Sequence, residues 1–210
     1  MKNNAYSVSE ERINVISHFI GLLASIVALV LLVQKACKHQ DILYRISFII
    51  FGLSLIVLYA ASTLYHNEKK PKRRQALNVL DHAAIYVLIA GTYTPFSLVT
   101  LHGTYGWILF GVSWAAALLG IGFKLFFFGK YSKLSTVLYV AMGWVVIFAI
   151  KPLLNHLPPA GLFWLVMGGL FYTVGAVLYS KDQLKYNHAI FHILVLLGSM
   201  CHFISIYFFV

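Results

Sequence analysis

The chain has 210 residues, of which 60% are hydrophobic and only 10% are charged, and its formal net charge at pH 7 is +10. A soluble domain is typically about 45–50% apolar and about 25% charged, so this composition excludes an ordinary soluble domain, a disordered chain and a secreted disulfide scaffold. The composition instead predicts an integral membrane protein, whose basic residues set its topology rather than bind nucleic acid.

Seven runs of the chain are long and apolar enough to cross a membrane as helices, which takes roughly 20 residues. In chain order they cover residues 13–34, 43–65, 79–100, 105–128, 134–150, 160–179 and 187–209, joined by short connections. None of them alternates with the two-residue period of a strand. The sequence therefore predicts an all-α bundle of seven transmembrane helices, forming a single integral membrane domain over residues 1–210.

The basic residues are distributed unevenly between the two sides of this bundle. If the N-terminus is cytoplasmic, twelve Lys and Arg residues fall in cytoplasmic segments and four in outside segments. Because Lys and Arg accumulate on the cytoplasmic side of membrane proteins, we expect a cytoplasmic N-terminus and an outside C-terminus. The chain is then a multi-pass protein of the cell membrane.

Polar residues enter the membrane at three helix ends that the topology brings to the same depth. The second run ends with Ser62 and His66, the third begins with Asp81, and the seventh begins with His188 and His192. All three ends lie at the cytoplasmic boundary. Ionisable residues at membrane depth are costly, so this group is a candidate functional site.

The spacing of the histidines predicts a metal site. His188 and His192 are four residues apart on one helix and therefore lie on one face. His66 can supply a third nitrogen, and Ser62 lies one turn earlier on the same helix. Three protein ligands with one open position are typical of catalytic zinc. Ligand type alone also admits copper, iron or nickel, and a pair of histidines at this spacing also occurs without a metal.

The six remaining histidines are expected to have other roles. His18 enters the first run from the same cytoplasmic side, so it has either a packing role or a supporting role beside the metal ligands. His202 lies ten residues beyond His192, which is about 15 Å along a helix, so it cannot share their metal and is expected to form a buried hydrogen bond. Four others are expected at the membrane interfaces: His39, His82, His102 and His156.

The residues of the candidate site resemble the signature of the CREST superfamily. This superfamily includes the progestin and adipoQ receptors, the alkaline ceramidases and the bacterial hemolysin III proteins. The resemblance rests on Ser62-x3-His66, Asp81 and His188-x3-His192. Two further stretches resemble the bacterial hemolysin III branch: Glu11-Arg12-Ile13-Asn14 running to Ser17-His18, and Asp81-His82-Ala83-Ala84-Ile85-Tyr86 running to Pro95-Phe96.

This resemblance implies a seven-helix protein of the bacterial plasma membrane with Zn²⁺ held by His66, His188 and His192. Asp81 and Ser62 would lie beside the metal. The leading hypothesis is a zinc-dependent hydrolase of a lipid amide or ester, in which Asp81 is the general base and Ser62 orients the water or stabilises the oxyanion. The alternatives are a membrane-perturbing cytolysin with structural zinc and a non-catalytic sensor of membrane lipid. The expected partner is a membrane lipid, as substrate or as ligand.

Overall fold

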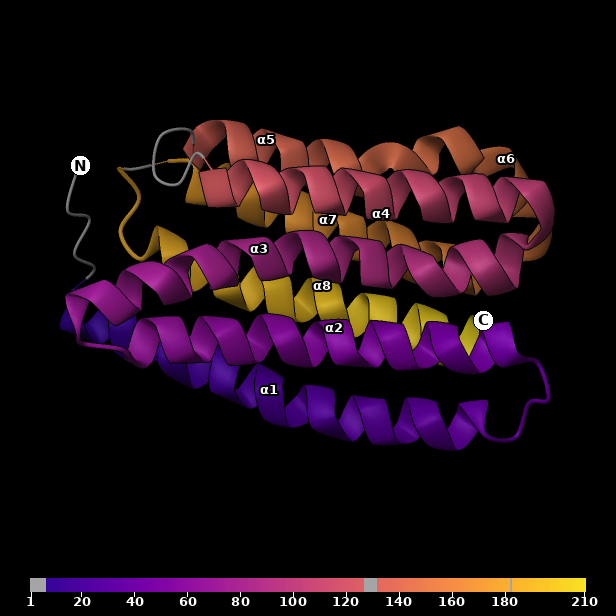
Figure 1. Cartoon of the computed structure of the whole chain (residues 1–210), viewed down its shortest axis with the longest axis horizontal. Coiled ribbons are helices and arrows are strands. Elements are labelled where there is room, and N and C mark those ends of the chain that lie inside the picture. Colours follow the sequence, from indigo (N-terminus) through magenta and orange to yellow (C-terminus); the bar gives the residue numbers. More distant parts are fainter. Residues whose placement is uncertain (1–6, 127–131, 182) are drawn as a thin grey trace.

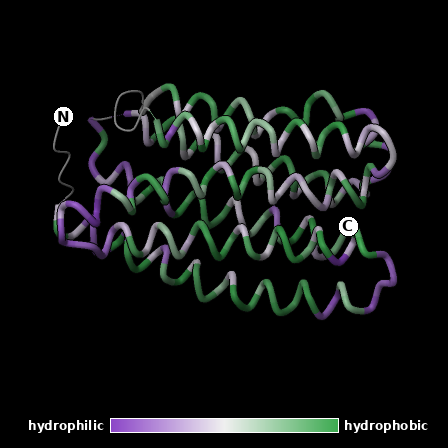
Figure 2. The backbone as a smooth tube through the Cα atoms, in the orientation of Figure 1, coloured by the Kyte–Doolittle hydropathy of each residue, from purple (hydrophilic) through white to green (hydrophobic). Residues whose placement is uncertain are grey.

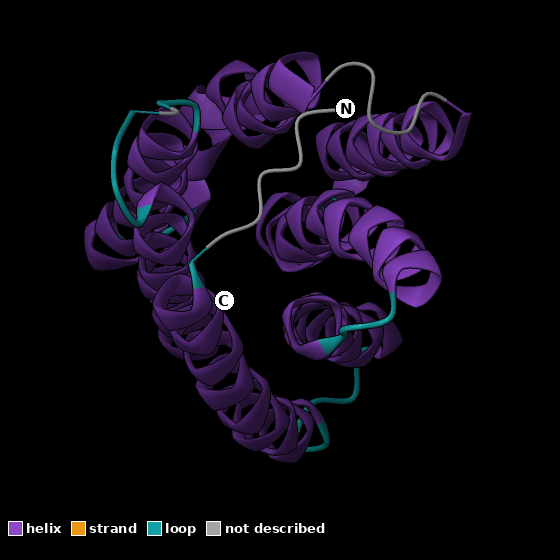
Figure 3. Ribbon diagram, turned by 90° about the vertical axis from the view of Figure 1, so that its left-hand side faces the viewer, coloured by secondary structure: helices purple, strands orange, loops and turns teal. Residues whose placement is uncertain are grey.

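The computed structural model describes residues 7–126, 132–181 and 183–210, and every regular element within these ranges is helical. The elements are α1 (Val8–Ala36), α2 (Ile42–Asn67), α3 (Pro71–Pro95), a π-helix η1 (Phe96–Leu101), α4 (Gly103–Phe126), α5 (Ser132–Gly143), a 3-10 helix η2 (Trp144–Ala149), α6 (Ile150–His156), α7 (Pro159–Tyr179) and α8 (Asn187–Phe209). Figure 3 looks along the bundle and shows these helices end-on.

Within the described ranges, seven stretches are long and apolar enough to cross a membrane, which confirms the predicted fold class. The third stretch combines α3 with η1, and the fifth combines α5, η2 and α6. The chain runs back and forth, so α1, α3, α5 and α8 begin at the end of the bundle where α2, α4 and α7 finish (Figure 1). Figure 2 shows hydrophobic residues along the helices and hydrophilic ones gathered towards the two ends.

Two helices begin more than one turn before the predicted apolar runs. α1 starts at Val8 because the side chain of Ser7 caps it, accepting a hydrogen bond from the Glu10 N–H at 3.2 Å. α3 starts at Pro71, since proline fits the first helical turn, where its missing N–H leaves no bond unmade. These added polar turns bring Glu11 and Arg74 into helices, and both residues reach the candidate site.

The helices differ in how much of their surface is covered by protein. α3 is the most buried of the membrane-crossing stretches, and α2 and α8 come next. The others expose large apolar side chains, Phe126 and Phe148 among them, as expected of surfaces that face lipid. Phe127 and Phe128, expected from the sequence to face lipid or the interface, lie outside the described residues, as do Lys2 and Lys130 of the charge count.

Candidate metal centre

Three buried histidines converge at the end of the bundle where α8 begins. His66 lies in the last turn of α2, and His188 and His192 lie in the first two turns of α8. Their ring centroids are 4.5–4.9 Å apart, and the Nε2 atoms of His66 and His188 are 3.0 Å apart. One nitrogen from each ring lies within 4.8 Å of the others. The convergence predicted from the sequence is therefore present.

These distances fit a metal ion held by imidazole nitrogens. In a tetrahedral zinc site with Zn–N distances of about 2.0–2.1 Å, two ligand nitrogens are about 3.3 Å apart. The Nε2 atoms of His66 and His188 are slightly closer than this, and one nitrogen of each ring lies within 4.8 Å of the others. The three histidines could hold a metal ion, and their nitrogen atoms do not by themselves select one.

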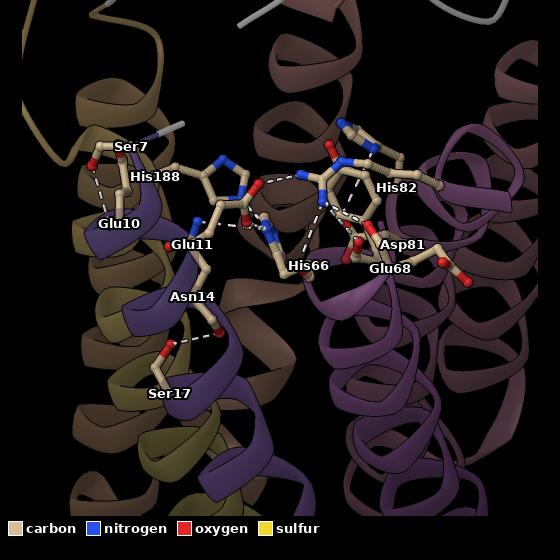
Figure 4. Close-up of polar contacts among 12 residues, drawn as sticks. Ser7, Glu10, Glu11, Asn14, Ser17, His66, Glu68, Asp81, His82 and His188 are labelled. Atoms are coloured by element: carbon tan, nitrogen blue, oxygen red, sulfur yellow. Dashed lines mark hydrogen bonds and ion pairs between the residues drawn. The ribbon is translucent and has the colours of Figure 1, made fainter. Parts of the chain in front are cut away.

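A carboxylate orients the first of the three rings. Glu11 of α1 places Oε2 at 2.7 Å from Nδ1 of His66, as Figure 4 shows, while Nδ2 of Asn14 is 3.5 Å from the same atom. A carboxylate accepts hydrogen bonds, so the shorter contact puts the proton of His66 on Nδ1 and leaves Nε2 free of a proton. This is the usual support of a metal-binding histidine, whose other nitrogen donates to a carboxylate.

Arg74 of α3 binds the other oxygen of Glu11 and joins three helices at this point. Its guanidinium also donates to the carbonyl oxygens of Tyr65, His66 and Glu68, and it lies 4.7 Å from the centroid of the Tyr65 ring. A cation at these carbonyl groups also complements the partial negative charge of the α2 C-terminus. Sequence reasoning missed the contacts of both Glu11 and Arg74.

Glu68 belongs to the connection between α2 and α3 rather than to the histidine cluster. Its carboxylate accepts hydrogen bonds from the N–H groups of Lys70 and Lys69, each at 2.9 Å. The bond from Lys70 is the main cause that lowers the pKa of Glu68 below its ordinary value. Glu68 therefore stabilises the turn as an anion.

The two predicted catalytic residues lie near the same end. Ser62, one turn before His66, has a hydroxyl oxygen that is buried without a hydrogen-bond partner among the described residues. Asp81 of α3 is also buried, and its Oδ2 is 3.9 Å from Nδ1 of His82. That nitrogen instead donates to the Asn78 carbonyl at 2.8 Å. The structure thus leaves the Ser62 hydroxyl and the Asp81 carboxylate available to a ligand.

A fourth histidine packs directly on the cluster. The ring of His18 stacks on that of His192, with centroids 3.6 Å apart and planes inclined by 17°. Both of its nitrogens are buried without hydrogen-bond partners within the described part of the chain. The sequence predicted that His18 lies at the same end of the bundle as the cluster, and the structure confirms this and adds its contact with the ring of His192.

An apolar cavity of about 180 Å³ extends from the histidine cluster into the bundle. Ser62, Asp81, His188 and His192 line one part of it. The remaining walls come from α2, α3, η1, α5, η2, α6, α7 and α8 and consist mostly of apolar side chains, such as Leu88, Ile89, Phe96, Ile147, Leu162 and Val195. The arrangement offers a hydrophobic chamber with reactive polar groups at one end.

Comparison with known proteins identifies similar chains. The family model described as Haemolysin-III related matches residues 6–203. Hemolysin-3 of Bacillus cereus is 45% identical over 203 residues, which cover 97% of this chain and 93% of that protein. Its homolog in Bacillus subtilis (strain 168) is also 45% identical, over 204 residues, or 97% of this chain and 96% of the homolog. The human monocyte to macrophage differentiation factor is 27% identical over 189 residues, which cover 84% of this chain and 76% of that protein. The resemblance noted in the sequence is confirmed.

Proposed function

This chain belongs to the haemolysin-III-related family and is a multi-pass protein of the bacterial membrane, and we propose that it is a metal-dependent hydrolase of an amide or ester bond in a membrane lipid. One observation carries the proposal. The apolar cavity ends at three clustered imidazoles, a buried carboxylate and an unpartnered serine hydroxyl. A purely structural cluster would not need an adjoining chamber of this size.

The proposed cofactor is Zn²⁺, held by His66, His188 and His192. Three neutral imidazoles suit zinc, and Glu11 supplies the expected support behind His66. When bound, such an ion lowers the pKa of water and polarises a carbonyl group.

The roles of the surrounding residues follow from their chemistry. Asp81 accepts a proton from the attacking water and returns it to the leaving amine or alkoxide. The Ser62 hydroxyl, which has no partner within the described residues, donates to the water or to the oxygen that becomes negative in the transition state. The acyl chain lies in the cavity, whose walls are mostly apolar.

We also propose that the chain forms one integral membrane domain. Its N-terminus lies in the cytoplasm. The lipid headgroup then faces the cytoplasm. Cys37 offers a test, since it is exposed in the connection between α1 and α2, at the opposite end from the histidines. A membrane-impermeant maleimide should label Cys37 on intact protoplasts. Labelling that requires permeabilised cells would reverse the orientation.

The function itself is tested by fatty-acid release. The purified, metal-loaded chain in bilayers that contain N-acyl and O-acyl lipids should release fatty acid, detected by mass spectrometry. Asp81→Asn should keep the bound metal and lose turnover, because it removes the proposed base and no ligand. Full turnover in Asp81→Asn would remove this base from the mechanism. Stoichiometric lipid binding without release would favour a lipid sensor.

A second candidate is cytolysis, favoured by the name Hemolysin-3 of two relatives. In that case the bound metal would be structural. Leakage of a fluorescent dye from vesicles containing the protein separates the two functions. Leakage that persists in Asp81→Asn would favour direct perturbation of the membrane, whereas leakage that requires lipid breakdown would favour the hydrolase.

A further inference from the structure

A second polar position lies in the cavity wall, deeper in the bundle than the histidine cluster. Among the described residues that line the cavity, four carry a buried nitrogen or oxygen atom without a hydrogen-bond partner. Three of them, His18, Ser62 and His192, belong to the histidine end. The fourth is His202 on α8, which lies about 15 Å farther along the helix axis than His192.

The ring of His202 is fixed in both position and tautomer. Its Nε2 lies 3.2 Å from the carbonyl oxygen of Leu165 on α7. A carbonyl oxygen only accepts hydrogen bonds, so Nε2 carries the proton and Nδ1 is an acceptor. The ring packs so closely on Gly168 that a Cβ atom added there would overlap it. The result is a rigid acceptor, Nδ1, that the described residues leave unused.

The polar groups around His202 are satisfied by one another. Tyr172, whose ring meets that of His202 edge to face, bonds through its hydroxyl to Ser199 at 2.8 Å. Ser199 also accepts a hydrogen bond from Tyr59 at 2.7 Å. No hydrogen bond from these hydroxyl groups, or from any other described residue, reaches Nδ1. Because an unpaired acceptor is costly at membrane depth, where water is scarce, Nδ1 is suited to a donor that the ligand brings.

We propose that Nδ1 of His202 accepts a hydrogen bond from a hydroxyl group partway along the hydrocarbon chain of the bound lipid. The proposal rests on the proposed function, which sets the lipid carbonyl at the histidine cluster. Because an extended hydrocarbon chain zigzags, each of its bonds advances it by only about 1.25 Å, so about twelve bonds cover ~15 Å. The ligand class is therefore an acyl lipid that is hydroxylated near the twelfth carbon.

Competition between fatty acids tests this subsite. The full-length, metal-loaded chain is incubated with equal amounts of stearate and 12-hydroxystearate, and the bound acid is identified by native mass spectrometry. We expect 12-hydroxystearate to be bound in about threefold to tenfold excess, the effect of one net hydrogen bond. Stearate hydroxylated at its second carbon carries the same group in the wrong place and should show no such excess.

Two substitutions of the same kind locate the effect. His202→Gln keeps an N–H donor for the Leu165 carbonyl and leaves no acceptor at the position of Nδ1, because the amide oxygen of Gln lies elsewhere, so the excess should disappear. His156→Gln changes an exposed histidine at the end of the bundle opposite the histidine cluster. This histidine donates to the Pro152 carbonyl, and the variant should keep the full excess. If His202→Gln does not fold, the two positional isomers still test the wild-type chain.

The outcomes separate this inference from the proposed function. Equal occupancy by stearate and 12-hydroxystearate, or an excess that survives His202→Gln, would overturn the subsite and leave the hydrolase untouched. A positional preference in a chain that releases no fatty acid from any lipid would contradict the hydrolase and support the subsite.

Discussion

The two ends of the bundle both pack basic side chains against aromatic rings, but they use these side chains differently. At the end opposite the histidines, Lys35 of α1 donates to the Tyr207 carbonyl at 2.6 Å and lies 5.4–5.9 Å from the centroids of the Tyr44, Phe48 and Tyr207 rings. Its bond near the C-terminus of α8 also matches the helix dipole. The charge is therefore matched within the protein.

The histidine end leaves polar atoms unmatched. The Ser62 hydroxyl, both nitrogens of His18 and Nδ1 of His192 are buried without hydrogen-bond partners in the described part of the chain, next to a cavity. Burial of a polar group therefore does not by itself mark a functional site in this protein. What distinguishes the candidate site is that its buried polar atoms lack hydrogen-bond partners and lie next to a cavity. The contacts of Lys35, in contrast, stabilise the fold.

The largest expected effect is loss of the metal from His188→Ala. This change removes one of three ligands, so metal affinity should fall by more than the roughly 10–100-fold that loss of a supporting residue costs. Elemental analysis of the purified variant measures this. His102→Ala, an exposed histidine at the other end, should keep its metal. Equal metal content in His188→Ala and His102→Ala would contradict the assignment of metal binding to the histidine end.

Glu11→Gln should weaken metal binding by about 10–100-fold without abolishing it. The amide keeps the size of the side chain but loses the charge that binds Nδ1 of His66 and the Arg74 guanidinium. A competition titration with a metal chelator gives the affinity. Wild-type affinity in a folded Glu11→Gln protein would show that the contact between α1 and α2 is only structural.

Lys35→Met should lower stability by about 2 kcal/mol, because it removes a charged hydrogen bond and the contacts with three rings. Thermal unfolding in detergent measures the loss. Metal content should stay at the wild-type level, since Lys35 lies at the far end of the bundle. A fall in metal affinity would mean that the two ends are coupled.

The smallest stability effect is expected for Ser62→Ala, within about 0.5 kcal/mol, because the hydroxyl has no partner to lose within the described residues. Turnover should nevertheless fall by about 100-fold. Ser199→Ala is the matched comparison. It leaves two tyrosine hydroxyls without their partner and should cost about 1–3 kcal/mol. Equal destabilisation by the two changes would place Ser62 among the structural serines.

The main features of the fold and the cluster could be predicted because they follow from periodicity and topology. Seven apolar runs set the direction of each helix, and this alone brings the ends that carry His66 and His188 to one depth. The spacing of His188 and His192 then sets two rings on one face. The buried hydrogen bond expected of His202 is also confirmed.

The supporting contacts could not be predicted in the same way. Glu11 and Arg74 lie in polar turns outside the apolar runs, and the helices extend over them because of a serine cap and a proline. Glu11 meets His66 across 55 positions of sequence, and no local pattern encodes that contact. Likewise, topology puts His18 at the correct depth, but only side-chain packing brings its ring onto that of His192.

X-ray absorption spectroscopy of the chain loaded with zinc tests the central claim most directly. The account predicts one ion per chain with three imidazole nitrogens at about 2.0 Å, and loss of one imidazole in a sample of His192→Ala that retains metal. Fewer than two imidazoles around the ion, or a folded chain that binds no metal when zinc is in excess, would contradict it.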